Sequence, residues 1–377
     1  PHRSRYGRSA RIFFCAQLRT KSLLLSRFVL ALPMSARALD SSLANVKIPD
    51  LVISADSHVT EPMDLWKVLP ADITARMPVM EPFGALPDGG EDPVARIVDM
   101  DRDGLAAEVL YPTAALELYR FEPDIQKAAF QLYNDWIANY CKHAPDRLIG
   151  VPMIAMHDVD AAIIELKRCY DMGLKGALIW QVPHPDLPLH SSHYNPFWAV
   201  AAEMNVPVNM HILTGHSYDR TNLTGFERIR GSVNIKTHDA INCIHDMLWS
   251  GVFERHPTLK MVIVEAEIGW IPFILQQWDY YYHRHGRKGI HKFPISRTPT
   301  DIFNDHVFAT FMDDTVGSYL LPHWGDRNCM WSSDYPHENT TWPNSKAFIA
   351  QQIGGLPMER QMRLASQNVI DLYGLNF

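Results

Sequence analysis

Four apolar runs in the sequence end in ionisable side chains of the kinds that bind metal ions. Imidazole nitrogen and carboxylate oxygen are ligands that Zn²⁺ and Mn²⁺ accept in proteins. A buried carboxylate also needs a cation or a hydrogen-bond donor, because an unpaired buried charge is costly. The pattern therefore predicts a mononuclear metal site with two nitrogens and two oxygens. The candidate residues are Asp56 with His58 on the first run, and His211, Glu265 and Asp334 on later runs.

Asp56 and His58 lie two residues apart in Ser54-Ala55-Asp56-Ser57-His58. Positions i and i+2 of an extended chain project to the same side, so this pair can face a single ion. A plainer explanation is that the carboxylate only orients its neighbouring histidine, or that the strand simply ends in polar residues. Partners from other strands are therefore needed to favour a metal site.

The later residues also have plainer explanations when each is taken alone. His211 could be a buried core histidine, Asp334 could cap the next helix, and Glu265 could pair with a nearby Arg or His. All of them, however, are expected at the carboxyl end of a strand. Independent core histidines and helix caps have no reason to coincide there, so the shared register favours one metal site.

Such a site requires parallel strands whose carboxyl ends meet. Short apolar segments alternate with amphipathic helical patterns along the chain, and this alternation favours βαβ units. No Gly-x-Gly-x-x-Gly turn follows the first strand, and eight strands fit a closed barrel better than an open sheet. We therefore predict an α/β fold, a single TIM-like (β/α)8 barrel with a loop insertion after strand 1. Strands are expected at 51–55, 108–111, 148–154, 176–180, 207–211, 261–265, 307–311 and 330–333, and the clearest helices at 123–143, 158–171, 196–204, 236–253 and 271–285.

Two long connections are expected near the predicted metal site. Residues 61–93 are rich in Pro and Gly, and they predict an insertion or lid over one end of the barrel. Residues 286–300 form a second irregular stretch, which is basic and contains proline. In barrel enzymes the active site is built from loops at the carboxyl ends of the strands. Residues 357–372, in contrast, are amphipathic and are expected to pack outside the barrel.

Composition limits the partners. The chain of 377 residues is 47% hydrophobic, which is ordinary globular composition, and its formal charge is −7. This charge gives no broad basic surface, so we expect a small-molecule substrate, no nucleic acid and no membrane. Five cysteines lie far apart and form no Cys-x-x-Cys pair, so neither a disulfide framework nor a zinc knuckle is indicated. A reducing compartment, the cytoplasm, fits best.

Residues 1–39 differ from the rest of the chain. They contain eight basic side chains and no acidic one. Such a leader resembles an organelle transit peptide, and organelle import is therefore the alternative location; Met34 could equally be the true start of translation. The apolar run 23–34 is too short to span a bilayer. We expect a basic leader at 1–39 that is disordered or not native, and a metal-dependent barrel at 40–377.

Six motifs in a fixed order link the chain to a known family. They are Asp56-Ser57-His58-Val59-Thr60-Glu61-Pro62 with Asp64-Leu65-Trp66, Asn195-Pro196-Phe197-Trp198, Met210-His211, Val264-Glu265-Ala266-Glu267-Ile268-Gly269-Trp270-Ile271-Pro272, Ser333-Asp334-Tyr335-Pro336-His337, and Leu372-Tyr373-Gly374-Leu375. With these motifs, residues 50–375 resemble the amidohydrolase superfamily, specifically its second amidohydrolase family. Aminocarboxymuconate-semialdehyde decarboxylase and non-oxidative aromatic acid decarboxylases typify that family.

The resemblance implies specific roles. Asp56, His58, His211 and Asp334 match the positions of the family's metal ligands, and the family implies one divalent metal, Zn or Mn, and a homodimer. The sequence departs from the family at two places. Asp56 replaces the first histidine of the commoner His-x-His motif, and Glu265 stands where a catalytic histidine usually ends strand six.

The resemblance implies a non-oxidative decarboxylase of an aromatic or unsaturated ring-derived acid. Asp334 is the candidate proton carrier, and Glu265 is either a second acid/base or an anchor for a neighbouring group. His337, Trp66 and His216 are the candidate substrate contacts. A metal-dependent hydrolase of an ester, amide or C–C bond is the alternative, with Asp334 deprotonating the attacking water. A catalytically silent ligand-binding barrel is a more distant alternative. A serine hydrolase is disfavoured because no Gly-x-Ser-x-Gly elbow occurs.

Overall fold

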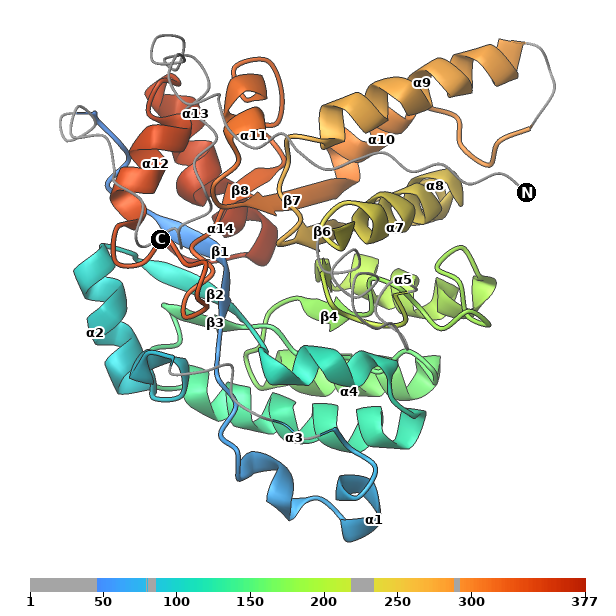
Figure 1. Cartoon of the computed structure of the whole chain (residues 1–377). Coiled ribbons are helices and arrows are strands. Elements are labelled where there is room, and N and C mark those ends of the chain that lie inside the picture. Colours follow the sequence, from blue (N-terminus) through green and yellow to red (C-terminus); the bar gives the residue numbers. More distant parts are fainter. Residues whose placement is uncertain (1–45, 79, 81–85, 218–233, 288–291) are drawn as a thin grey trace, which may run out of the picture.

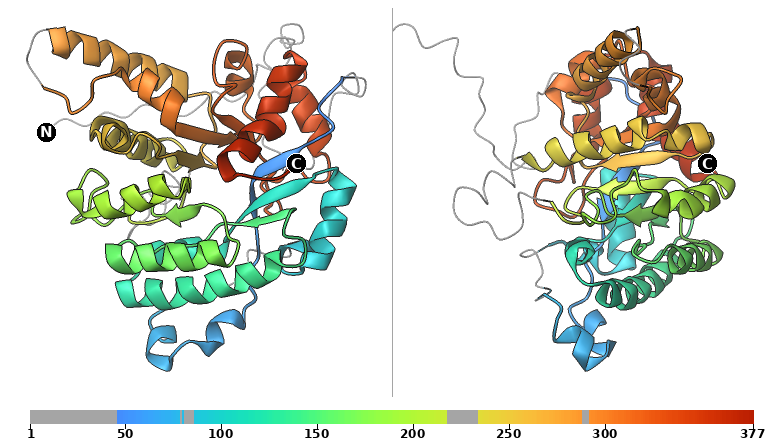
Figure 2. Two further views of the ribbon diagram at one scale, coloured as in Figure 1. Left: turned by 180° about the vertical axis from the view of Figure 1, so that it is seen from behind. Right: turned by 90° about the vertical axis from the view of Figure 1, so that its right-hand side faces the viewer.

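A computed structural model describes residues 46–78, 80, 86–217, 234–287 and 292–377. Eight parallel strands within this range form the centre of the molecule, and the helices are arranged around the outside of them (Figures 1 and 2). The basic leader predicted at 1–39 lies outside the described residues. The strands are β1 Ile53–His58, β2 Ala107–Tyr111, β3 Leu148–Gly150, β4 Ala177–Ile179, β5 Val208–His211, β6 Met261–Val264, β7 Val307–Phe311 and β8 Cys329–Trp331.

The strands close into a barrel through two seams. Regular parallel pairing runs from β1 to β3 and from β4 to β8. Between β3 and β4, Met153 bridges Leu178, which extends the pairing past the end of β3. Between β8 and β1, the Asp334 amide donates to the Asp56 carbonyl at 3.0 Å. The predicted eight-stranded barrel is therefore confirmed, and the second seam brings two of the predicted site residues together.

The helices lie in the connections between the strands and after β8, and several begin at a polar cap that the sequence supplies. Asp92 accepts a hydrogen bond from the Val94 amide at the start of α2, and Asp158 accepts one from the Ala161 amide at the start of α4. The helices are α1 Ala71–Thr74, α2 Pro93–Asp103, α3 Pro123–Cys141, α4 Val159–Asp171, α5 Asn195–Glu203, α7 His238–Trp249, α8 Val252–Arg255, α9 Ile271–Arg287, α10 Pro299–His306, α11 Thr315–Leu320, α12 Ser345–Ile353, α13 Met358–Met362 and α14 Asn368–Tyr373.

The structure differs from the sequence-based boundaries in three informative places. β1 continues to His58, so Asp56 and His58 belong to the strand and do not follow it. The helix predicted at 236–253 is divided in two, because Gly251 adopts φ 72° between α7 and α8. The connection at 61–93 contains short helices at Leu65–Val68, Ala71–Thr74 and Asp88–Gly90, so its described part is more regular than a plain loop.

The end of the chain closes the amino-terminal end of the barrel. A π-helical turn at Arg363–Gln367 joins α13 to α14, and the Asn368 amide group donates to the carbonyl of Cys329, where β8 begins. The helical segment packs on the barrel, and Tyr373, one residue beyond the segment for which a prediction was made, lies deeper. Tyr373 is buried and donates a 2.6 Å hydrogen bond to Asn209 of β5, so it reaches into the barrel interior.

Within the described residues, no helix has both the length and the apolar character that a membrane crossing requires.

Candidate metal centre

The predicted ligands meet at the carboxyl ends of the strands. Asp56 and His58 project from β1, and His211 is the last residue of β5. Glu265 directly follows β6, and Asp334 follows β8. Asp56, His58 and His211 are fully buried, and the Asp334 side chain is 3% exposed. Four strands distant in the sequence thus deliver these groups to one place.

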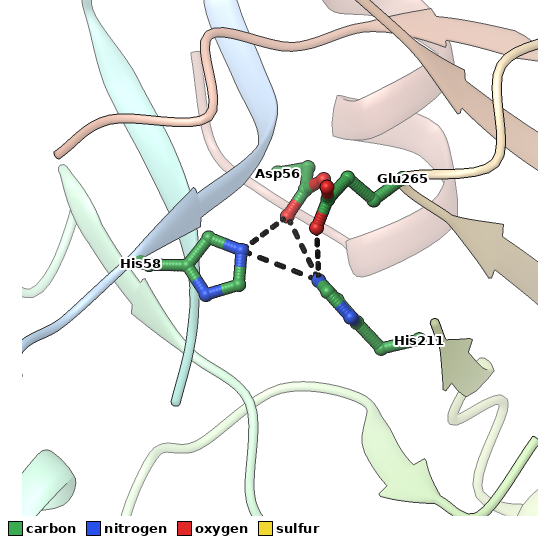
Figure 3. A group of neighbouring side chains, drawn as sticks. All are labelled: Asp56, His58, His211 and Glu265. Carbon is green, nitrogen blue, oxygen red and sulfur yellow. Dashed lines mark hydrogen bonds and ion pairs between the residues drawn. The ribbon is translucent and has the colours of Figure 1, made fainter. Parts of the chain in front are cut away.

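Four of these side chains form a tight group (Figure 3). Asp56, His58, His211 and Glu265 each place a ligand atom within 4.8 Å of the others. The two histidine Nε2 atoms are 3.2 Å apart, and the Nε2 atom of His58 is 3.4 Å from Asp56 Oδ1. The Nε2 atom of His211 is 3.7 Å from Asp56 Oδ1 and 3.5 Å from Glu265 Oε2. Two nitrogens and two carboxylates therefore surround a single point.

Second hydrogen bonds orient both imidazoles. The Nδ1 atom of His58 donates to the carbonyl of Pro112 at 2.8 Å, and the Nδ1 atom of His211 donates to the carbonyl of Ile212 at 2.8 Å. A carbonyl oxygen can only accept, so the proton lies on Nδ1 in each ring. Nε2 is then the atom that faces the centre in both, which is the usual arrangement of metal-binding histidines.

The environment of Asp56 fits a bound cation. Both carboxylate oxygens are buried, and neither accepts a hydrogen bond from any part of the chain that the structure describes. Burial alone would raise the pKa of Asp56, but the imidazoles of His211 and His58 hold that pKa well below its usual range. A fully buried carboxylate that stays ionised without a hydrogen bond is costly unless a positive charge balances it. The donor set of two imidazoles and carboxylates suits a divalent ion.

Two of the acidic residues adopt a backbone conformation that non-glycine residues rarely adopt. Glu265 has φ 61° and Asp334 has φ 55°. The Thr310 hydroxyl accepts the Glu265 amide at 2.8 Å, and the Asp334 amide binds the Asp56 carbonyl. Such conformations cost free energy and concentrate at functional sites. Here they turn two carboxylates into the mouth of the barrel at the points where β6 and β8 end.

Asp334 forms a second group with His337. The Nδ1 atom of His337 is 2.8 Å from Asp334 Oδ1, which in turn lies 3.5 Å from Nε2 of His58. Burial would lower the pKa of His337, but the charge of Asp334 beside it raises that pKa to about 9. His337 therefore carries a proton at neutral pH and presents it to Asp334. His58, Glu265, Asp334 and His337 together form the second cluster with metal-binding spacing.

The structure adds one residue to the ligand set that the resemblance implied. The resemblance assigned Asp334 to the ligands and gave Glu265 either of two roles, although the strand-end pattern had named both residues. In the structure, Glu265 belongs to both clusters, whereas Asp334 joins only the second one. In the sequence, the position of Glu265 at the end of a buried strand was the signal for this role. We therefore count Glu265 as a candidate ligand beside Asp56, His58 and His211, with Asp334 at the open side of the same centre.

A cavity of about 510 Å³ opens onto these groups. Glu265, Asp334 and His337 line it on one side, and apolar residues that include Leu116 and Leu213 line it elsewhere. This volume and this mixture of polar and apolar walls suit a small organic molecule. His337 is thus placed where a substrate contact was predicted.

The other two predicted substrate contacts lie elsewhere. Trp66 is 5% exposed and belongs to the apolar core, because its short helix packs against the body of the protein. His216 lines a separate cavity of about 660 Å³ with His157 and His184. Neither residue borders the cavity that contains Asp334. We therefore retain only His337 from this set.

One charged neighbour was missed by the sequence reasoning. The ammonium group of Lys236 lies 3.2 Å from Glu265 Oε1. Lys236 precedes α7 and belongs to none of the recognised motifs, so no local signal identified it. It adds a positive charge to a cluster otherwise built from carboxylates and imidazoles.

Comparison with known proteins places these observations in a family context. The amidohydrolase family model matches residues 53–375. A curated gamma-resorcylate decarboxylase from Rhodococcus jostii is 30% identical over 221 residues, which cover 55% of this chain. The match spans 65% of the length of that relative.

Solved structures share the fold. The 5-carboxyvanillate decarboxylase from Sphingomonas paucimobilis superposes with a TM-score of 0.68 at 19% identity, covering 87% of this chain and 100% of the other. A dihydroxybenzoic acid decarboxylase from a Polaromonas species, solved with manganese and the inhibitor 2-nitroresorcinol, gives a TM-score of 0.65 at 18% identity and covers 87% and 98% of the two chains. At this identity the likeness establishes the barrel.

Proposed function

Because the chain belongs to the amidohydrolase family, we propose that it is a metal-dependent decarboxylase of an aromatic or unsaturated ring acid. The observation that carries this proposal is the buried cluster of Asp56, His58, His211 and Glu265 beneath a cavity that also contains Asp334 and His337. The names of the similar proteins support the substrate class, since they include decarboxylases of gamma-resorcylate and of 5-carboxyvanillate.

Asp56, His58 and His211 would hold one divalent ion, Zn²⁺ or Mn²⁺, and Glu265 or Asp334 would complete its ligands. Such an ion supplies Lewis acidity toward substrate oxygens. The two Nδ1 hydrogen bonds keep both imidazoles in place for this role. The manganese in the Polaromonas structure supports Mn²⁺ as one of the two candidate metals.

Asp334 and His337 would handle the proton. Non-oxidative decarboxylation adds a proton to the ring carbon and breaks its bond to the carboxyl group, which leaves as carbon dioxide. His337 holds a proton against Asp334 Oδ1, and both residues line the cavity. Asp334 can therefore pass a proton to the ring carbon and recover one from His337. The Nε2 atom of His337 lies 3.1 Å from the Thr113 hydroxyl, which fixes the ring in this orientation.

The direct test is carbon dioxide release by metal-loaded protein. Hydroxybenzoates and related ring acids would be screened with protein loaded with Mn²⁺ or Zn²⁺, and elemental analysis would give the metal content. We expect carbon dioxide release that a chelator abolishes and added metal restores, and strong loss of turnover in Asp334→Asn. Full activity of metal-free protein would contradict the proposal. Solvent oxygen appearing in the product would indicate a hydrolase instead.

The expectations of a homodimer and of a cytoplasmic location stay predictions. Light scattering of purified protein would determine the oligomeric state, and localisation of the tagged full chain would determine the compartment.

A further inference from the structure

Glu265 connects a lysine to the histidines of the metal centre. Its Oε1 atom lies 3.2 Å from the Lys236 ammonium group, and its Oε2 atom lies 3.5 Å from Nε2 of His211. The two oxygens of one carboxylate therefore face different partners. Glu265 also lines the cavity, so the lysine charge is one side chain away from the space for a substrate. The Lys236 side chain is 34% exposed, and the Glu265 side chain is 15% exposed.

The charges of the centre explain why a lysine is needed there. Three carboxylates, those of Asp56, Glu265 and Asp334, surround the site of a divalent ion. The divalent ion offsets two of these charges, and His337 offsets the third through its contact with Asp334. These groups together therefore give no net attraction for an anion, and the effect of one further charge is strong where burial lowers the effective dielectric constant. The Lys236 charge, within contact distance of Glu265, makes the centre net positive.

We propose that Lys236 makes the centre selective for ring molecules that carry a carboxylate. It does so by balancing the charge of Glu265 and by holding that side chain between the lysine and His211. Lys236 is thus a specificity-determining and positioning residue, and its role rests on the proposed function for the identity of the anion. An ammonium group acts as a compact point charge, so its effect on a ligand in the cavity requires no direct contact.

The test compares two planar ring ligands of nearly the same shape, benzoate and benzamide, which differ in charge. Neither carries the ortho hydroxyl of the candidate substrates, so binding is measured without relying on turnover. Calorimetry would use Mn²⁺-loaded wild type, Lys236→Met, Lys236→Arg and, as a matched control, Lys167→Met on the exposed surface of α4. Metal content would be measured for every variant.

We expect Lys236→Met to weaken benzoate binding by roughly tenfold or more and benzamide binding by less than about twofold. Lys236→Arg should restore the preference for benzoate, and Lys167→Met should leave it unchanged. An equal loss for both ligands would overturn the inference, because it would assign Lys236 a merely structural role. Unchanged benzoate binding in Lys236→Met would overturn it as well, and the Arg variant guards against loss of folding.

The same experiment separates this inference from the proposed function. A wild-type protein that prefers benzoate through Lys236 but releases no carbon dioxide from any ring acid would refute the decarboxylase and leave the role of Lys236 intact. A wild-type protein that releases carbon dioxide but binds benzoate no better than benzamide would refute the role of Lys236 alone.

Discussion

The Nε2 atoms of His58 and His211 face each other at 3.2 Å, so one proton can be shared between them as a hydrogen bond. Burial lowers the pKa of His58, and the charge of His337 lowers it further. Burial also disfavours the charged form of His211, but Asp56 and Glu265 outweigh this effect and raise its pKa. In the metal-free centre His211 therefore holds a proton more readily than His58 does, in the place where a cation would bind.

Metal uptake should consequently release a proton. A divalent ion needs the unprotonated Nε2 atom of His211, so the ion competes with the proton. Because the pKa of His211 is raised, we expect affinity for Zn²⁺ or Mn²⁺ to fall as pH is lowered, by about tenfold per pH unit below that pKa. Calorimetry in buffers of different ionisation enthalpy would count the protons released. Binding that releases no proton at any pH below that pKa would contradict this assignment.

Replacing Glu265 with Gln should separate turnover from metal binding. The amide keeps the shape of the side chain but removes the charge that faces both His211 and Lys236. Asp56, His58 and His211 still offer three ligands, so we expect most of the metal to be retained. Turnover should fall by roughly a hundredfold or more if Glu265 orders the reacting groups. Elemental analysis and initial rates would be measured on the same preparation, and an unchanged rate would limit Glu265 to a structural role.

Glu267 should make the stability of the metal-free fold depend on pH. Burial raises its pKa from 4.5 to about 7, although its Oε2 atom accepts the Met312 amide. Between these pH values the folded chain holds a proton that the unfolded chain has released. The free energy of unfolding should therefore fall as pH rises through this range, by on the order of 3 kcal/mol, and stay level above it.

Urea unfolding at acidic and neutral pH, with chelator present, would measure the contribution of Glu267. The Glu267→Gln variant should lose that part of the pH dependence, whereas Glu91→Gln on the exposed surface should keep it. An identical pH profile for Glu267→Gln and wild type would show that the carboxyl group is not protonated in the folded chain.

The barrel and most of its metal centre could be predicted because they follow local patterns. Apolar strands of four to eight residues that end in an acid or a histidine fix both the fold and the side of the barrel on which the ligands lie. His211 and Glu265 were identified in this way, and the structure brings them together. Strand ends were less certain, and β1 extends to His58 because its pairing continues as far as Tyr111 of β2.

Contacts between distant segments could not be predicted in the same way. Lys236 precedes a helix and reaches Glu265 only because β5 and β6 are neighbours in the barrel. Trp66 and His216 carry the residue types of a substrate pocket, but packing places one in the core and the other in a separate cavity. Side-chain type indicates what a residue can bind, whereas its position depends on how the loops pack.

Tyr373 should support the metal centre from the interior of the barrel. Its hydroxyl and that of Tyr111 both donate to Asn209 Oδ1, at 2.6 and 2.9 Å, and all three residues are buried. The Tyr111 ring lies 5.4 Å from the ring of His211, centroid to centroid. Removing the hydroxyl in Tyr373→Phe leaves a buried amide oxygen with one donor fewer. We expect a loss of about 1–2 kcal/mol in the free energy of unfolding.

The same change should weaken divalent metal binding by up to about tenfold, because outer groups that orient a ligand contribute to affinity. Tyr319→Phe on α11 is the matched control, since Tyr319 is 79% exposed, and it should alter neither quantity. Urea unfolding of chelated protein would give the stability, and titration with Mn²⁺ would give the affinity. A loss of stability with wild-type metal affinity would show that the hydrogen bonds of Tyr111, Asn209 and Tyr373 stabilise the barrel but do not orient the metal ligands. Unchanged values of both would mean that the Tyr373 hydroxyl contributes neither to stability nor to the metal centre.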